Sequence, residues 1–187
     1  MRLFVSVDLP ESLTEAFAAL QAEFDAVPGL RVVDPEQAHL TLQFLGEVGP
    51  AQVATLEREL AAAVDESGVF PFTARFAGLG AFPNRDYIRV LWLGVEDGRD
   101  QFSRLHDAIE ARTTALGFEA DGHEFTPHVT LGRMTHAGGK ETLQHLLSTH
   151  TPTVGEMRVD EVRLTESTHT ADGPRYETRE RFSLEAD

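Results

Sequence analysis

The sequence has no cysteine among its 187 residues. Disulfide bonds, thiolate zinc sites and a cysteine nucleophile are therefore excluded. No stretch approaches the roughly 18 consecutive apolar residues that a transmembrane helix needs, and the apolar part of residues 1–9 is too short for a secretory signal. We therefore expect a protein of the cytoplasm that has no membrane partner.

Lysine is almost absent: Lys140 is the only one, beside 15 arginines, whereas 31 residues are acidic and the net charge is −15. Strong acidity normally argues against a polyanionic partner, because lysine and arginine bind phosphates. An acidic chain poor in lysine also resembles proteins of organisms that keep molar salt in the cytoplasm, where a Debye length of about 3 Å screens repulsion of RNA. We interpret the charge as halophilic; the alternative is an ordinary acidic protein.

The composition, 41% hydrophobic and 25% charged, is typical of one globular domain, and no linker divides residues 1–187. Apolar periodicity predicts helices over residues 11–26, 51–66, 101–116 and 140–148. It predicts strands over residues 2–9, 31–34, 39–46, 70–82, 87–95, 128–134, 157–167 and 175–184. Short connections that mix hairpins with helices favour an α+β fold with largely antiparallel sheets.

A short motif occurs twice, as His39-Leu40-Thr41-Leu42 and as residues 128–131, which read His-Val-Thr-Leu. Each copy lies in a run that alternates polar and apolar residues, the pattern of a half-buried strand. The histidine and threonine of each copy therefore share one face, and the apolar residues point into the core. The copies start 89 positions apart, close to half the chain length. This spacing predicts an internal duplication with two similar lobes.

Two histidines on opposite sides of a phosphorus atom suit hydrolysis of a cyclic phosphodiester. One activates water as a base and the other protonates the leaving ribose oxygen, because their ordinary pKa keeps both protonation states accessible. The hydroxyls of Thr41 and Thr130 would bind the non-bridging oxygens. Neither a metal, a cofactor nor a covalent intermediate is required. The alternative is that these are structural histidines in strands that match by chance.

The sequence around the two motifs resembles the two-histidine phosphoesterases, in particular the RNA 2′,3′-cyclic phosphodiesterases, also called 2′-5′ RNA ligases. Residues 39–46 (HLTLQFLG) resemble the first motif of that family, and residues 125–133 (FTPHVTLGR) resemble the second. Residues 2–8, 80–83, 89–92 and 164–167 also match in the expected order. The resemblance therefore runs almost from end to end.

The resemblance implies a bilobal fold with pseudo-twofold symmetry, built from two antiparallel sheets flanked by helices, with the motifs facing across a central groove. It implies hydrolysis of an RNA 2′,3′-cyclic phosphate end to a 2′-phosphate. The sequence is nearly symmetric between the two motifs, and we assign His39 as the acid and His128 as the base. Joining of such an end to a 5′-hydroxyl as a 2′-5′ bond, without ATP, is implied as a secondary activity.

Two further residues are candidates for substrate binding. Arg133 follows the second motif and is expected either to contact a phosphate, as in the family, or to form a surface ion pair. Strict alternation places it on the face opposite His128, so the phosphate contact requires a bulge near Gly132. Phe44 has the same difficulty, and it either packs in the core or stacks on a base.

Other histidines and glycines add no recognisable site. The six remaining histidines form no metal-binding pattern, and residues 138–140 (GGK) lack the upstream glycine of a phosphate-binding loop. Two alternative functions stay open: a non-catalytic module that binds phosphorylated or cyclic RNA ends, and a phosphodiesterase for small cyclic nucleotides. We expect a monomer, because no long apolar surface stripe is left over.

Overall fold

A computed structural model describes residues 1–184 of the chain. It contains four α-helices, nine β-strands and four short 3-10 helices. The helices are α1 (Thr14–Ala22), α2 (Val53–Glu66), α3 (Arg99–Ala115) and α4 (Lys140–Thr149), with 3-10 turns η1 (Glu11–Leu13), η2 (Pro35–Gln37), η3 (Pro50–Gln52) and η4 (Ala137–Gly139). The strands are β1 (Arg2–Asp8), β2 (Leu30–Val32), β3 (His39–Glu47), β4 (Phe72–Pro83), β5 (Ile88–Asp97), β6 (His128–Met134), β7 (Thr153–Val159), β8 (Glu161–Thr170) and β9 (Gly173–Ser183).

All strand pairs are antiparallel, and the strands follow the order β7-β4-β5-β6-β3-β1-β8-β9, with β2 attached to β6. The α+β class with antiparallel pairing is therefore confirmed. The two expected sheets meet as one, because β3 and β6 pair at Leu40 and Val129. Beyond that pair, β6 continues with β2 as its partner in place of β3.

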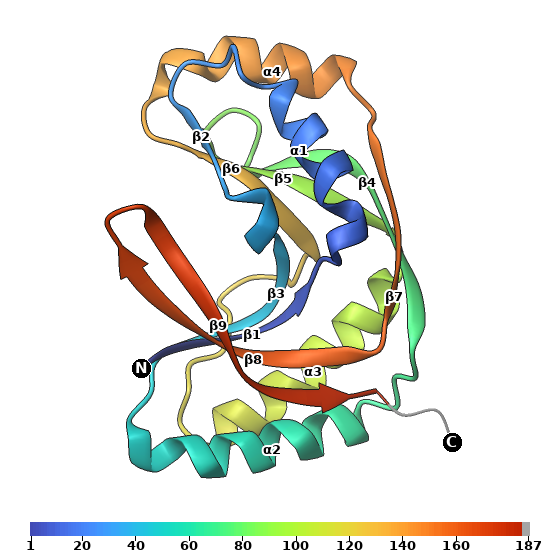
Figure 1. The fold of residues 1–187 in the computed structure, drawn as a ribbon, viewed down its shortest axis with the longest axis vertical. Coiled ribbons are helices and arrows are strands. Elements are labelled where there is room, and N and C mark those ends of the chain that lie inside the picture. The colour runs from blue at the N-terminus through green and yellow to red at the C-terminus, as the bar shows by residue number, and fades with distance from the viewer. Residues whose placement is uncertain (185–187) are drawn as a thin grey trace.

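Each half of the sheet has its own pair of helices (Figure 1). Helices α2 and α3 lie along the half that contains β1, β3, β8 and β9, whereas α1 and α4 lie at the half that contains β4 to β7. Leu40 and Val129 are fully buried, as are Leu42 and Leu131 of the two repeated motifs. The apolar residues of both motifs thus face the core, as the alternation predicts.

Most predicted elements are present, with two differences. The first helix ends at Ala22, and the chain continues to Val27 through successive turns. The strand predicted over residues 157–167 is wrong as one element, because the chain changes partner at Asp160. The segment before it, β7, pairs with β4, and the segment after it, β8, pairs with β1. Within residues 1–184, no helix is both long and apolar enough to cross a membrane.

Candidate active site

The two motif histidines are held in the same way. The Nδ1 atom of His39 lies 3.0 Å from the carbonyl oxygen of Gln37, and that of His128 lies 2.7 Å from the carbonyl oxygen of Thr126. A carbonyl can only accept, so Nδ1 carries the hydrogen in each ring. The Nε2 atom of each ring is therefore left to exchange a proton with a ligand.

The central strand pair places the two motifs diagonally across from each other. Because β3 and β6 run antiparallel from the pair of Leu40 and Val129, His39 lies on the side of Thr130, and His128 lies on the side of Thr41. All four polar side chains are half-buried. Each histidine therefore faces the threonine of the other motif on one surface of the sheet.

Aromatic rings surround His39. The ring of Phe4 lies 4.9 Å from it and the ring of Tyr176 lies 5.0 Å from it, between centroids. Gln37 fixes the β8–β9 hairpin in place, since its side chain donates to the carbonyl of Pro174 and accepts from the backbone N–H of Tyr176. A small cavity of about 100 Å³ opens beside the histidine. Its lining residues are Phe4, Asp8, Leu9, Glu36, Gln37, Ala38, His39, Thr165 and Tyr176.

The other half supplies a similar aromatic wall for His128. The centroid of Phe82 lies 4.8 Å from that of His128, and the centroid of Trp92 lies 5.7 Å away. Gly80 makes room for the indole, because a Cβ there would lie 2.1 Å from Trp92. The structure therefore places Trp92 beside the histidine, at the edge of the site.

A β-bulge interrupts the first motif. Val5 of β1 pairs with Gln43 of β3. The next residue of β1, Ser6, pairs with Thr41, so Leu42 is an extra residue in the ladder. Leu42 and Gln43 are consequently both buried, although they are neighbours in a strand.

The second motif has the corresponding bulge. Leu91 of β5 pairs with Gly132 of β6, and the next residue, Trp92, pairs with Thr130. Leu131 is therefore the extra residue, at the same place in its motif as Leu42 in the first. From each bulge onward, every side chain of the strand points to the face of the sheet opposite to the one that strict alternation would give it.

This reversal decides the positions of Phe44 and Arg133, which follow their histidines by five residues. Phe44 is 65% exposed and its ring lies 6.0 Å from that of Phe4, so the core-packing interpretation is wrong. Arg133 is exposed, and its charge acts on both His39 and His128. The bulge that Arg133 requires is thus present, next to Gly132 as expected.

A buried side chain from a helix holds each bulge. The Nε2 atom of Gln21, on α1, donates to the carbonyl oxygen of Leu131 at 3.1 Å and to that of Val33 at 2.8 Å. On α3, Nδ1 of His106 donates to the carbonyl oxygen of Leu42 at 2.7 Å. Sequence reasoning missed both residues, because a hydrogen bond over such a separation leaves no local pattern.

His106 also contacts the loop that leads to the second motif. Its ring stacks on Phe125 with a centroid distance of 4.2 Å, and its Nε2 lies 3.3 Å from a carboxylate oxygen of Glu110 and 3.8 Å from one of Asp121. Within residues 1–184 this is the one group of three side chains close enough to hold a metal ion. Glu110 also accepts from the backbone N–H of Asp121, so the contacts serve to hold the loop.

Burial and charge act together on His39. Burial lowers its pKa below the usual value, and the positive charge of Arg133 lowers it further. The carbonyl of Gln37 and the carboxylate of Asp8 oppose this effect and raise the pKa. Asp8 is opposite His39 in the β1–β3 ladder, and Arg163 donates to one of its carboxylate oxygens at 2.8 Å, whereas the hydroxyl of Ser6 donates to the other at 3.2 Å.

In the described part of the chain, no carboxylate acts on the pKa of His128. Burial lowers its pKa, and the charges of Arg133, His39 and His123 lower it further, whereas the carbonyl of Thr126 raises it. Burial and Arg133 thus lower the pKa of both histidines, and the two differ in their other charged neighbours. Asp8 favours the protonated form of His39, and only positive charges act on His128.

Comparison with known proteins shows the family to which the chain belongs. The family model of the 2′-5′ RNA ligase superfamily matches residues 9–171. The chain belongs to this superfamily. It is 37% identical over 176 residues to an RNA 2′,3′-cyclic phosphodiesterase of Archaeoglobus fulgidus, covering 94% of this chain and 96% of the relative. It is 32% identical to an RNA 2′,3′-cyclic phosphodiesterase of Aquifex aeolicus, covering 98% of this chain and 97% of the relative. The RNA 2′,3′-cyclic phosphodiesterase relatives are thus similar over almost the whole chain, and the chain is an enzyme of this class.

Solved structures of the superfamily have the same fold. A protein of Thermus thermophilus superposes with a TM-score of 0.80 at 30% identity, over 98% of both chains. E. coli LigT complexed with 3′-AMP superposes with a TM-score of 0.76 at 26% identity, over 98% of this chain and 97% of that one. The two-histidine phosphoesterase fold expected from the motifs is therefore confirmed.

Removal of the Arg133 charge tests the electrostatics of the site. In Arg133→Gln we expect the pKa of both His39 and His128 to rise, because a nearby positive charge disfavours the imidazolium form. Titration of the ring protons by NMR measures both values in one experiment. Arg158→Gln, which removes an exposed arginine from β7, is the matched control and should change neither. An Arg133→Gln variant in which only one histidine shifts would contradict a shared site.

Proposed function

We propose that this member of the 2′-5′ RNA ligase superfamily hydrolyses RNA 2′,3′-cyclic phosphate ends to 2′-phosphates without a metal ion. The observation that carries the proposal is the matched pair of histidines, each with Nδ1 bound to a carbonyl two residues earlier and Nε2 left for the substrate. The relatives named RNA 2′,3′-cyclic phosphodiesterase support the choice of substrate.

In the proposed reaction the Nε2 atom of His128 takes a proton from water, and the water oxygen forms a bond to phosphorus. The bond from phosphorus to the 3′ oxygen breaks, and the Nε2 atom of His39 gives that oxygen its proton. One histidine starts neutral and the other protonated, so a second proton transfer through solvent restores the enzyme. Thr41 and Thr130 donate to the non-bridging oxygens as their charge grows.

Asp8 supports the assignment of His39 as the acid. A carboxylate beside an imidazole favours the charged form, whereas within residues 1–184 no carboxylate acts on the pKa of His128 and the charge of Arg133 lowers it. Arg133 would bind a non-bridging oxygen, since a guanidinium suits phosphate geometry. Phe44, exposed on the same face, would stack on the terminal base.

Several further properties are part of this proposal. ATP-independent 2′-5′ ligation follows as a secondary activity, with a 5′-hydroxyl in the place of the water. The matching bulges and histidine contacts support one bilobal domain that arose by duplication, although residues 185–187 lie outside the described part. A monomer and a cytoplasmic location stay predictions. The free Nε2 atoms favour catalysis over a module that only binds RNA ends.

The two histidines are tested directly by substitution. We expect His39→Ala and His128→Ala each to lower kcat/KM for a 2′,3′-cyclic-ended RNA by about 10²–10⁴-fold, since each removes one proton transfer. The assay is run in EDTA, and the product end is identified by mass and by phosphatase sensitivity. His145→Ala, in α4, is the control and should leave the rate unchanged. Conversion that depends on a metal, or a 3′-phosphate product, would contradict the proposal.

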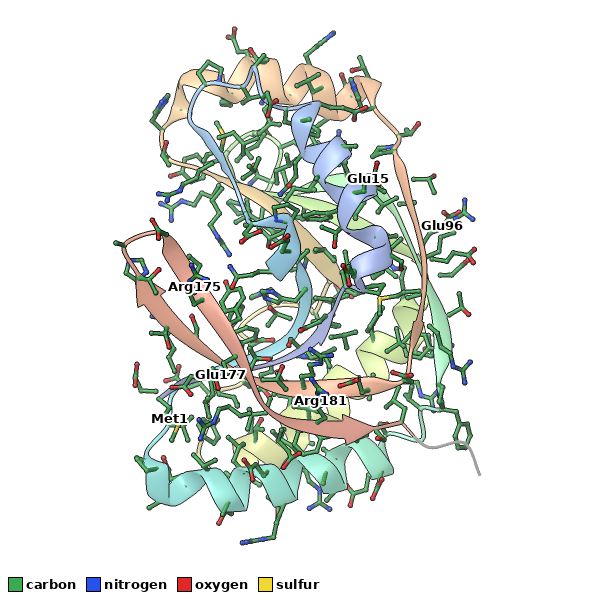
Figure 2. All side chains as sticks on the ribbon, in the orientation of Figure 1. Met1, Glu15, Glu96, Arg175, Glu177 and Arg181 are labelled. Carbon is green, nitrogen blue, oxygen red and sulfur yellow. The ribbon has the colours of Figure 1, made fainter. Side chains whose placement is uncertain are left out.

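We also propose that the acidic surface is an adaptation to high salt. Acidic side chains such as Glu15 and Glu96, labelled in Figure 2, are exposed to solvent. Added ions screen the mutual repulsion of such groups, which otherwise destabilises the compact state.

The unfolding temperature tests this interpretation of the charge. We expect it to rise as KCl increases from about 0.1 M into the molar range, because the Debye length falls from about 10 Å to about 3 Å. A parallel series in sucrose separates charge screening from general exclusion of solutes. A midpoint that falls steadily with KCl would refute the halophilic interpretation.

A further inference from the structure

Arg31 on β2 lies directly opposite Arg133 on β6. The two residues are partners in the antiparallel ladder, so their side chains leave the same face of the sheet. This is the face on which Arg133 acts on both histidines. Arg31 therefore lies on the same surface as the active site, on the strand next to the one that carries Arg133 and His128.

Neither arginine has a hydrogen-bond or ion-pair partner within residues 1–184. Like charges directly opposite each other in a sheet are destabilising, and here both side chains are exposed beside an enzyme site. The chain has 31 acidic residues against 16 basic ones, yet none of those in the described part neutralises this pair. An unneutralised guanidinium pair is suited to an anion from outside the chain.

Negative and positive side chains lie on different sides of the site, and this distribution indicates the side on which an RNA strand would leave it. The cavity beside His39 is lined by the carboxylates of Asp8 and Glu36, which would repel a phosphate chain. The β2–β6 side carries Arg31 and Arg133, so an RNA strand would leave the site over these arginines.

We propose that Arg31 binds the phosphate on the 5′ side of the terminal nucleotide while Arg133 binds the cyclic phosphate. This inference rests on the proposed function and extends it from the reacting group to the preceding residue of the chain. It makes the enzyme selective for an RNA end over a free nucleoside 2′,3′-cyclic phosphate, which has no such phosphate.

Three substrates distinguish the proposed contact of Arg31 with the 5′-side phosphate from the contact of Arg133 with the cyclic phosphate. They are uridine 2′,3′-cyclic phosphate, its 5′-phosphorylated form, and a diuridylate with a 2′,3′-cyclic end. The quantity measured is the ratio of kcat/KM for each phosphate-containing substrate to kcat/KM for the plain nucleoside form. Arg31→Ala is compared with Arg58→Ala, which removes an exposed arginine from α2 without an acidic partner in the described chain, and thermal melts confirm that both variants fold.

In Arg31→Ala we expect both ratios to fall about tenfold, the size of one lost charge-assisted contact. The slope of log(kcat/KM) against log[KCl] for the diuridylate should become shallower by about 0.7, as for one lost contact to a single strand. Arg58→Ala should change neither quantity. Unchanged ratios in a folded Arg31→Ala variant that still hydrolyses all three substrates would overturn this inference alone. Failure of the wild type on all three would overturn the proposed function as well.

Discussion

The backbone pairing of Leu40 with Val129 is the constraint on which the site depends. It joins two halves of a sheet whose motifs lie 89 positions apart in the chain. Because the strands are antiparallel, this one pair sets each histidine near the threonine of the other motif. His106 of helix α3 then donates to the carbonyl oxygen of Leu42 in the first motif. Gln21 of helix α1 donates to the carbonyl oxygen of Leu131 in the second. The geometry of the active site is thus stabilised by side chains of helices on the buried face of the sheet.

The paired bulges explain how a half-buried strand offers more than two side chains to a substrate. In a regular strand, the residues five positions after His39 and His128 would face the core. One extra residue in each motif reverses them, so Phe44 and Arg133 join the histidines. The reversal buries the side chain of Gln43, whose Oε1 accepts from Thr113. Because a bulge occurs at the same place in both motifs, we infer that the active site requires it and that it is not a local irregularity.

Local patterns in the sequence were sufficient for most strands and helices and for the shared face of each histidine and threonine, because residues 39–42 and 128–131 alternate with a period of two. They did not show that the chain changes its strand partner at Asp160, because that change depends on pairing with distant strands. They could not place Phe44, since a bulge changes the face without changing the residues. Tyr176 and Gln21 were missed for another reason. Their contacts with His39 and Leu131 cross from separate elements, and only the tertiary structure brings them together.

The most direct test of the account is the rate of the double variant His39→Ala/His128→Ala on a 2′,3′-cyclic-ended RNA, compared with each single variant. Two groups that serve one phosphate act as a unit, so we predict that the double variant is no slower than the slower single variant, within a few-fold. Losses that multiply in the double variant would show that the histidines act independently. That result would contradict a single acid–base pair across the β3–β6 junction.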